Sequence, residues 1–224
     1  STSALLDDIK YGSLSLNEDD SSVLLGVGLA TLMGTSIGDK IALIGKNGQG
    51  KTTLINILQK KLKFGSGKMK SADGLDVKVF SQNRDALPLD KSPFEIIGDG
   101  QDFVHLPDGS QKHVNSYLEN FLFESTEIRR PINTLSGGEK NRLQLALFMK
   151  EAADLWIFDE PTNDLDIDTL EILEAMLQDF PGTLILVSHD RALLDNLVTS
   201  TLILSGDGRV IESVGGYLDW HQSQ

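Results

Sequence analysis

A chain of 224 residues can bury a full hydrophobic core, and 40% hydrophobic with 24% charged residues is the composition of an ordinary globular domain. No apolar run approaches the roughly 20 residues that span a bilayer, the N-terminus lacks the features of a secretory signal, and the absence of cysteine excludes disulfides and thiolate metal sites. The simplest expectation from these three features is a cytoplasmic protein without a membrane partner. The net charge of −13 argues against a large nucleic-acid-binding surface.

The first half of the chain shows mostly strand signals. Residues 1–36 mix short apolar runs with glycine and acidic turns, which predicts irregular β structure. Lys40–Ile44 is a nearly continuous apolar run, typical of a buried parallel strand, and a glycine-rich loop and a helix over Thr52–Lys63 follow it. Residues 75–80 alternate at period two and predict another strand. Lysines cluster around a predicted turn at residues 65–67 and are interpreted as an exposed rim: Lys60, Lys61, Lys63, Lys68 and Lys70.

The rest of the chain returns to regular alternation after a polar middle segment at about 84–134. Within that segment Asp108–Ser110 predicts an exposed turn, and Val114–Phe123 has helical spacing. Strands alternating with helices then predict a parallel α/β sheet. We expect strands over Leu155–Phe158 and Leu184–Ser188, and helices over Gly138–Lys150, Thr169–Phe180 and Arg191–Val198.

The loop between the first buried strand and its helix fits the pattern Gly-x4-Gly-Lys-Ser/Thr of a phosphate-binding loop. Its glycines let backbone N–H groups turn toward the β- and γ-phosphates, and the helix directs its positive end at the same anion. Lys51 adds a point charge, and the Thr52 hydroxyl can ligate magnesium. The predicted ATP-binding residues of the loop are Gly45, Lys46, Asn47, Gly48, Gln49, Gly50, Lys51, Thr52 and Thr53.

Polar residues follow three of the predicted strands. Asp159 ends an apolar strand, where it can hold magnesium directly or through water, and Glu160 is placed to accept a proton from an attacking water. Gln82 follows the strand at 75–80, and His189 follows the strand at 184–188, where a γ-phosphate contact is expected. These positions predict a catalytic site at the carboxyl edge of the sheet.

A third motif lies between the two halves of this site. Ser136 and Glu139 form a capping-box pattern, which predicts that a helix begins there. Two glycines between them expose the first N–H groups of that helix to an approaching phosphate.

These motifs, in this order, resemble those of the ABC ATPases, together with the loop at Leu165–Asp166. The resemblance covers about residues 5–224 and implies an α/β phosphate-loop domain with a mostly parallel core sheet, an N-terminal antiparallel β subdomain and a helical subdomain. The single domain would divide into a core of about 37–83 and 150–224, a helical subdomain of about 84–149, and a β subdomain of about 1–36 with 64–80.

A finer resemblance is also present. Phe158–Asp166 is similar to the ABC-F subfamily, whose members carry two nucleotide domains and no transmembrane domain. His113–Phe123 and Val214–Trp220 are similar to the second, C-terminal nucleotide domain of Uup-type members.

The resemblance implies a head-to-tail pair of domains in which the signature motif of one closes over the ATP of the other. That motif is Leu135, Ser136, Gly137, Gly138 and Glu139. The implied catalytic residues are Glu160 as general base, Lys51, Gln82, Asp166 and His189; the implied magnesium ligands are Thr52, Gln82 and Asp159. Tyr11 is the candidate for the aromatic residue that stacks on adenine.

Three uses of such a site compete. The first is an ABC-F ATPase that acts on the ribosome or on branched DNA through regions outside this chain. The second is the ATPase subunit of an ABC transporter, which the Pro161–Asp166 stretch disfavours, and the third is a non-catalytic nucleotide sensor, which intact Asp159, Glu160 and His189 disfavour. The expected partner is a second nucleotide domain, normally in the same polypeptide, or a second copy in a weak homodimer. The isolated domain should therefore be a weak ATPase.

Overall fold

The computed structural model describes residues 38–63, 75–80, 87–163, 165–205 and 210–222. The chain divides into two compact units, which are described separately. The sheet unit takes in the chain up to Val79, Asp154–Glu160 and the residues from Phe180 onward; the helical unit takes in Phe80–Ala153 and Pro161–Asp179. Most of the expected β subdomain and Tyr11, Gln82, Lys68 and Lys70 lie outside the described residues. The division into core, helical and β subdomains stays a prediction.

The sheet has six strands in the order β2-β5-β6-β1-β7-β8. β1 is parallel to both β6 and β7, β5 is parallel to β6, and only the β7–β8 pair among the registered pairs of this sheet is antiparallel. The mostly parallel α/β sheet is therefore confirmed. The strands are β1 (Lys40–Gly45), β2 (Val77–Phe80), β5 (Leu155–Asp159), β6 (Thr183–Val187), β7 (Ser200–Leu204) and β8 (Val210–Val214).

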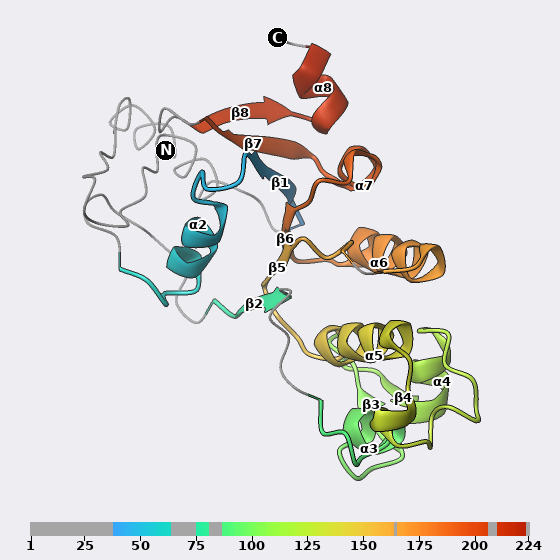
Figure 1. The fold of residues 1–224 in the computed structure, drawn as a ribbon. Coiled ribbons are helices and arrows are strands. Elements are labelled where there is room, and N and C mark those ends of the chain that lie inside the picture. Colours follow the sequence, from blue (N-terminus) through green and yellow to red (C-terminus); the bar gives the residue numbers. More distant parts are fainter. Residues whose placement is uncertain (1–37, 64–74, 81–86, 164, 206–209, 223–224) are drawn as a thin grey trace. The chain divides into compact units, whose positions relative to one another are not determined.

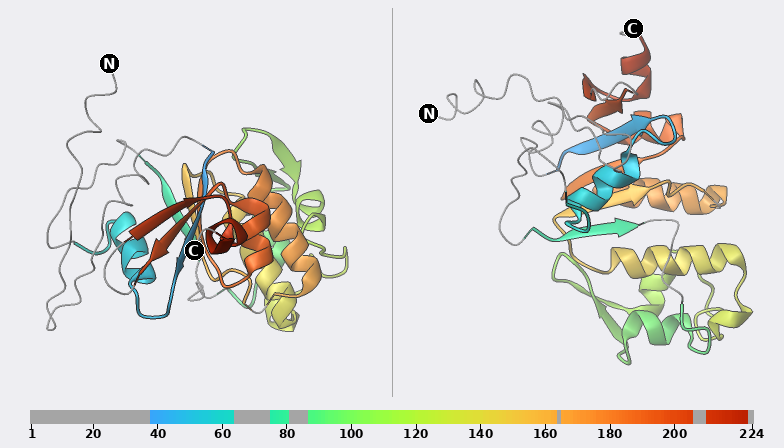
Figure 2. Two further views of the ribbon diagram at one scale, coloured as in Figure 1. Left: turned by 90° about the horizontal axis from the view of Figure 1, so that it is seen from above. Right: turned by 60° about the vertical axis from the view of Figure 1, so that its left-hand side comes forward.

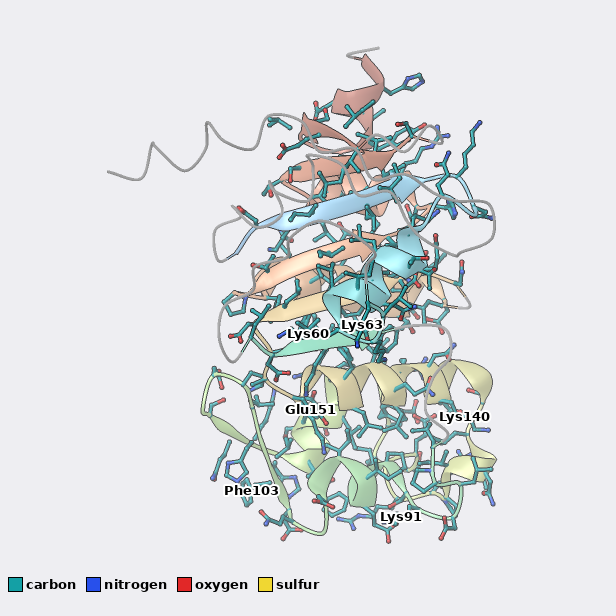
Figure 3. The ribbon with its side chains drawn as sticks, turned by 90° about the vertical axis from the view of Figure 1, so that its left-hand side faces the viewer. Lys60, Lys63, Lys91, Phe103, Lys140 and Glu151 are labelled. Atoms are coloured by element: carbon teal, nitrogen blue, oxygen red, sulfur yellow. The ribbon has the colours of Figure 1, made fainter. Side chains whose placement is uncertain are left out.

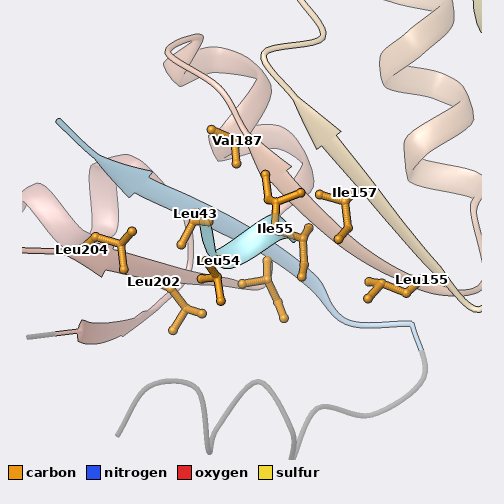
Figure 4. Close-up of a cluster of buried hydrophobic side chains, with 10 residues drawn as sticks. Leu43, Leu54, Ile55, Leu155, Ile157, Val187, Leu202 and Leu204 are labelled. Atoms are coloured by element: carbon orange, nitrogen blue, oxygen red, sulfur yellow. The ribbon is translucent and has the colours of Figure 1, made fainter. Parts of the chain in front are cut away.

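Helices α2 (Lys51–Leu58) and α7 (Arg191–Leu197) lie on opposite faces of the sheet unit (Figure 1 and Figure 2). On the α2 face, Leu54 and Ile55 pack into a core of buried aliphatic side chains from β1, β5, β6 and β7 (Figure 4). Continuous apolar strands arise because both faces of a parallel sheet are covered. This packing fixes the start of α2 relative to the end of β1. A short helix, α8 (Tyr217–Gln222), follows β8.

The helical unit contains two long helices, α5 (Gly137–Met149), which begins at the signature motif, and α6 (Ile167–Asp179). Its shorter elements are α3 (Pro93–Gly98), the antiparallel hairpin of β3 (Phe103–His105) and β4 (Gln111–His113), α4 (Val114–Glu119) and the 3-10 helix η1 (Ile132–Thr134). The hairpin and α3 were not expected from the sequence. The exposed turn at Asp108–Ser110 is confirmed, since it joins the two hairpin strands.

Two helices end earlier than their apolar spacing predicts. The helix expected over Thr52–Lys63 ends at Leu58. Lys60 there adopts a left-handed φ of 59°, and the N–H groups of Lys60 and Lys61 bond back to the carbonyl oxygens of Ile57 and Asn56, a Schellman closure. The lysines that follow, Lys60, Lys61 and Lys63, are exposed, as expected (Figure 3).

The helix expected over Val114–Phe123 shows the same kind of ending. It stops at Glu119, and Leu122 adopts a left-handed φ of 58° while the N–H of Phe123 bonds to the carbonyl oxygen of Leu118. Such closures usually use glycine. Because Lys60 and Leu122 take that place here, the sequence carries no signal for either end.

Candidate functional site

The phosphate-binding loop joins β1 to α2, where the sequence predicts it. Gly48 and Gly50 have φ values of 83° and 91°, which side chains with a Cβ rarely adopt. Gly50 is also the N-cap of α2, and it provides no side-chain hydrogen bond to the first turn. The N–H groups that begin α2 are therefore left for an anion, and the helix dipole favours negative charge at the same place.

The ammonium group of Lys51 lies over this loop. Its Nζ donates to the carbonyl oxygen of Gly45 over 2.5 Å and to that of Lys46 over 3.5 Å. The Gln49 side chain accepts the N–H of Lys46, and the Gln49 N–H donates to the Lys46 carbonyl over 3.2 Å, so the loop is closed by its own bonds. Thr52 is exposed next to this charge.

Asp159 and Glu160 follow at the carboxyl end of β5. Asp159 is paired in register with Val187 at the end of β6, and the N–H of Glu160 donates to the carbonyl oxygen of Val187 over 2.8 Å. Burial raises the pKa of the Asp159 carboxyl, and the positive charge of Lys51 opposes that shift. The carboxylate therefore lies within electrostatic reach of the phosphate-loop lysine.

Both carboxylate oxygens of Glu160 contact His189. Oε1 lies 3.2 Å from Nε2 of the His189 ring, and Oε2 accepts the His189 backbone N–H over 3.3 Å. Glu160 has a left-handed φ of 52°, which is uncommon for a residue other than glycine, asparagine or aspartate. Strain of this kind often accompanies functional sites. The structure thus brings together two of the residues that were predicted to be catalytic.

The oxygen atoms near the loop are compatible with magnesium. Thr52 offers an exposed hydroxyl, and Asp159 offers a half-buried carboxylate. Mg²⁺ is commonly held by one or two protein oxygens together with substrate phosphates and water, so a hydroxyl and a carboxylate of this kind would suit it.

The signature motif begins α5 in the helical unit, and the predicted capping box is confirmed. The Ser136 side chain accepts the N–H of Glu139 over 3.2 Å, and the Glu139 carboxylate accepts the N–H of Ser136. Burial acts to raise the pKa of Glu139, but hydrogen bonds from Ser136 and Glu127 outweigh it and lower the pKa to about 2. Leu135 is buried, while Ser136 and Gly137 are exposed at the start of the helix.

Asp166 lies in the helical unit as well. Its Oδ1 accepts the N–H and the hydroxyl of Thr169, over 2.8 Å and 2.5 Å, in the first turn of α6. Its Oδ2 forms an ion pair with Arg142 of α5 at 3.4 Å. Arg142 was not predicted from the sequence, because a basic residue inside a helix carries no signal of a partner 24 positions away.

His113 and Trp156 have structural roles. The Nδ1 atom of His113 accepts the N–H of Asn115 and so caps α4. Trp156 is buried in the sheet unit and stacks on Phe180 with ring centroids 3.7 Å apart. Trp156 therefore packs in the core of this unit.

A parallel sheet with a phosphate-binding loop after β1 and an acidic pair after β5 defines a phosphate-loop nucleotide-binding domain. A family model described as "ABC transporter" matches residues 33–163, more than half of the chain, so the chain belongs to the ABC transporter family. It is an ATP-binding domain of that family.

The relatives agree with the resemblance to Uup-type proteins. An "ATP-binding protein Uup-like" of Haemophilus influenzae is 43% identical over 209 residues, which cover 92% of this chain and 45% of that protein. The "ATP-binding protein Uup" of Escherichia coli is 45% identical over 182 residues, 81% of this chain and 28% of that protein. The chain therefore spans less than half the length of these two curated relatives.

A solved structure confirms the fold. The bacterial Atm1-family ABC exporter with ATP bound matches with a TM-score of 0.67 and 18% identity, covering 95% of this chain and 39% of that chain. In the described part of this chain, none of the helices has the length and apolar character required to cross a membrane.

Proposed function

We propose that this chain binds ATP on its phosphate loop and hydrolyses it within a pair of nucleotide domains, each completing the site of the other. The observation that carries the proposal is the contact of Glu160 with His189 in the same unit as Lys51 and Asp159. A general base must be held and oriented near the reacting water, and His189 holds both oxygens of Glu160.

Each residue has a part in this mechanism that follows from its charge and position. Lys51 and the loop N–H groups bind and orient the phosphates, and Glu160 accepts the proton of the attacking water. Magnesium would be held by Thr52 and Asp159, with Gln82 as a further ligand, and when bound it neutralises phosphate charge. His189 orients the Glu160 carboxylate. Catalysis then consists of positioning and charge stabilisation, without a covalent intermediate.

The pairing follows from the motif content of the chain. It contains one phosphate loop, in the sheet unit, and one signature motif, in the helical unit. In the arrangement that the family resemblance implies, these two cannot act on the same ATP. The second domain would lie in the same polypeptide, which the greater length of the relatives supports, or would be a second copy of the chain.

We propose that the closure of the two paired nucleotide domains drives an action on the ribosome or on branched nucleic acid in the cytoplasm. The support is the resemblance to the ABC-F subfamily and the similarity to an "Energy-dependent translational throttle protein EttA" of Mycobacterium tuberculosis, which is 38% identical over 169 residues. The charge of −13 argues against a large contact with such a target on this chain, so we assign that contact mostly to regions outside it. The likeness to an exporter concerns the fold alone at 18% identity, so the transporter alternative gains no specific support from it.

The experiment that tests the proposed function compares phosphate release by the wild type and the Glu160→Gln variant, at several protein concentrations, with ATP and Mg²⁺. Hydrolysis that depends on concentration and is lost in the variant supports it. Hydrolysis that is retained by the variant would contradict the role of Glu160.

A further inference from the structure

The carboxylate of Asp166 lies against the first turn of α5. Oδ2 is 3.4 Å from a guanidinium nitrogen of Arg142 and 3.3 Å from the position that a Cβ on Gly138 would take. Gly138 and Arg142 are four residues apart, so they share one face of the helix. Since Oδ1 is bonded to Thr169, this one carboxylate joins the beginnings of α5 and α6.

This contact creates an electrostatic problem for the proposed function. The N-terminal end of α5 carries the positive end of the helix dipole and is the place where the ATP of the partner domain would bind. Hydrogen bonds from Thr169 lower the pKa of Asp166, and the charge of Arg142 adds to them, so the group is a carboxylate at neutral pH. An uncompensated carboxylate there would repel the incoming phosphates.

Arg142 is placed to remove that repulsion. Its side chain is only 14% exposed, and its guanidinium carbon lies 5.7 Å from the centre of the Phe123 ring, whereas the Asp166 side chain is 50% exposed. An ion pair as open to solvent as this one contributes little to folding stability. Its main effect is therefore on local charge and on where the carboxylate lies.

We infer that Arg142 is a positioning residue of the shared ATP site, which holds Asp166 against α5 and cancels its charge so that the signature end of the helix accepts the polyphosphate of the partner domain's ATP. This inference rests on the proposed function and adds to it a residue outside the predicted motif. A Cβ at position 138 would lie 3.3 Å from the Asp166 carboxylate, so a larger residue there would require this side chain to shift.

The test uses the Glu160→Gln chain as parent and measures its ATP- and Mg²⁺-dependent pairing by sedimentation velocity. Adding Arg142→Gln should weaken pairing by roughly tenfold, which is within the range of contacting pairs. Adding Asp166→Asn to that variant should restore most of the loss, because the repelling charge is then gone, and Arg142→Lys should retain part of the pairing. ATP affinity of the single chain, measured by calorimetry, should stay unchanged.

The matched control is Lys91→Gln, which makes the same change in net charge at an exposed lysine of the helical unit (Figure 3). The inference would be overturned if Arg142→Gln left pairing at the parent level, or if Asp166→Asn did not restore the lost pairing. The proposed function would stand in both cases. A parent that does not pair with ATP at all would overturn the proposed function and this inference with it.

Discussion

Nε2 of His189 lies 3.2 Å from Oε1 of Glu160, and the backbone N–H of the same histidine reaches Oε2 over 3.3 Å. The two residues come from the ends of neighbouring parallel strands, β5 and β6, whose registers bring Asp159 beside Val187. The strand register and these two contacts therefore orient the carboxylate of the proposed base within the sheet unit.

Glu160→Gln should leave ATP binding intact and reduce turnover by roughly 10²-fold or more, because the amide cannot accept the proton of the attacking water. Glutamine keeps the shape and can still contact His189, so the thermal midpoint should change little. Phosphate release measures the turnover, and calorimetry on the same preparation measures ATP binding. Turnover close to that of the wild type would show that another group is the base.

Lys51→Ala should abolish measurable ATP binding while the fold is retained. The Lys51 ammonium supplies the side-chain charge that lies over the loop, and its bonds to the Gly45 and Lys46 carbonyls are partly open to solvent. Calorimetry measures the affinity, and circular dichroism checks the fold. An unchanged affinity would remove the phosphate-loop assignment. Lys60→Ala, which changes an exposed lysine just beyond α2, is the matched control and should bind normally.

The raised pKa of Asp159 predicts a pH-dependent effect on stability. Burial raises this pKa in the folded state, so the folded chain binds the proton more tightly than the unfolded chain, and ionisation above the pKa costs stability. Asp159→Asn should therefore increase the free energy of unfolding at pH 7. The gain should disappear at about pH 3, below the ordinary Asp pKa of about 3.9. Urea unfolding at both pH values measures this, and a loss of stability at pH 7 would contradict it.

Ser136 has two separable roles. Ser136→Ala removes the cap of α5 and should cost about 1 kcal/mol of unfolding free energy. Ser136→Arg removes the same cap and also places a bulky side chain at the exposed start of the helix. Only the arginine variant should abolish ATP-dependent pairing in the Glu160→Gln background, with ATP binding unchanged. Equal loss of pairing in both variants would mean that the cap, and not access to the helix end, controls assembly.

Local patterns were sufficient to predict much of the sheet unit. The run Lys40–Ile44 and the glycines after it place the strand and the phosphate loop, because a buried strand, a turn and a helix each have their own short-range signal. The capping box of Ser136 and Glu139 predicts the start of α5 to within one residue for the same reason.

Features that depend on tertiary contacts could not be predicted in this way. Nothing near Lys60 or Leu122 in sequence marks the left-handed turns that end α2 and α4, since no glycine is present. The Arg142–Asp166 ion pair joins residues that are 24 positions apart in sequence, so neither residue alone indicates the other. Strand β3 could not be predicted either, because its Phe103 is exposed and its residues do not alternate between apolar and polar.

The rate of ATP hydrolysis per chain, measured for the wild type with Mg²⁺ as a function of chain concentration, decides whether the ATP site is shared between two domains. A site completed by a second domain predicts a low rate that rises with concentration. It should also rise with salt, because two chains of charge −13 repel each other and salt screens that repulsion. A shared site also predicts ATP-dependent dimers of the Glu160→Gln variant. A brisk rate that is independent of concentration, from chains that sediment as monomers, would contradict the shared site.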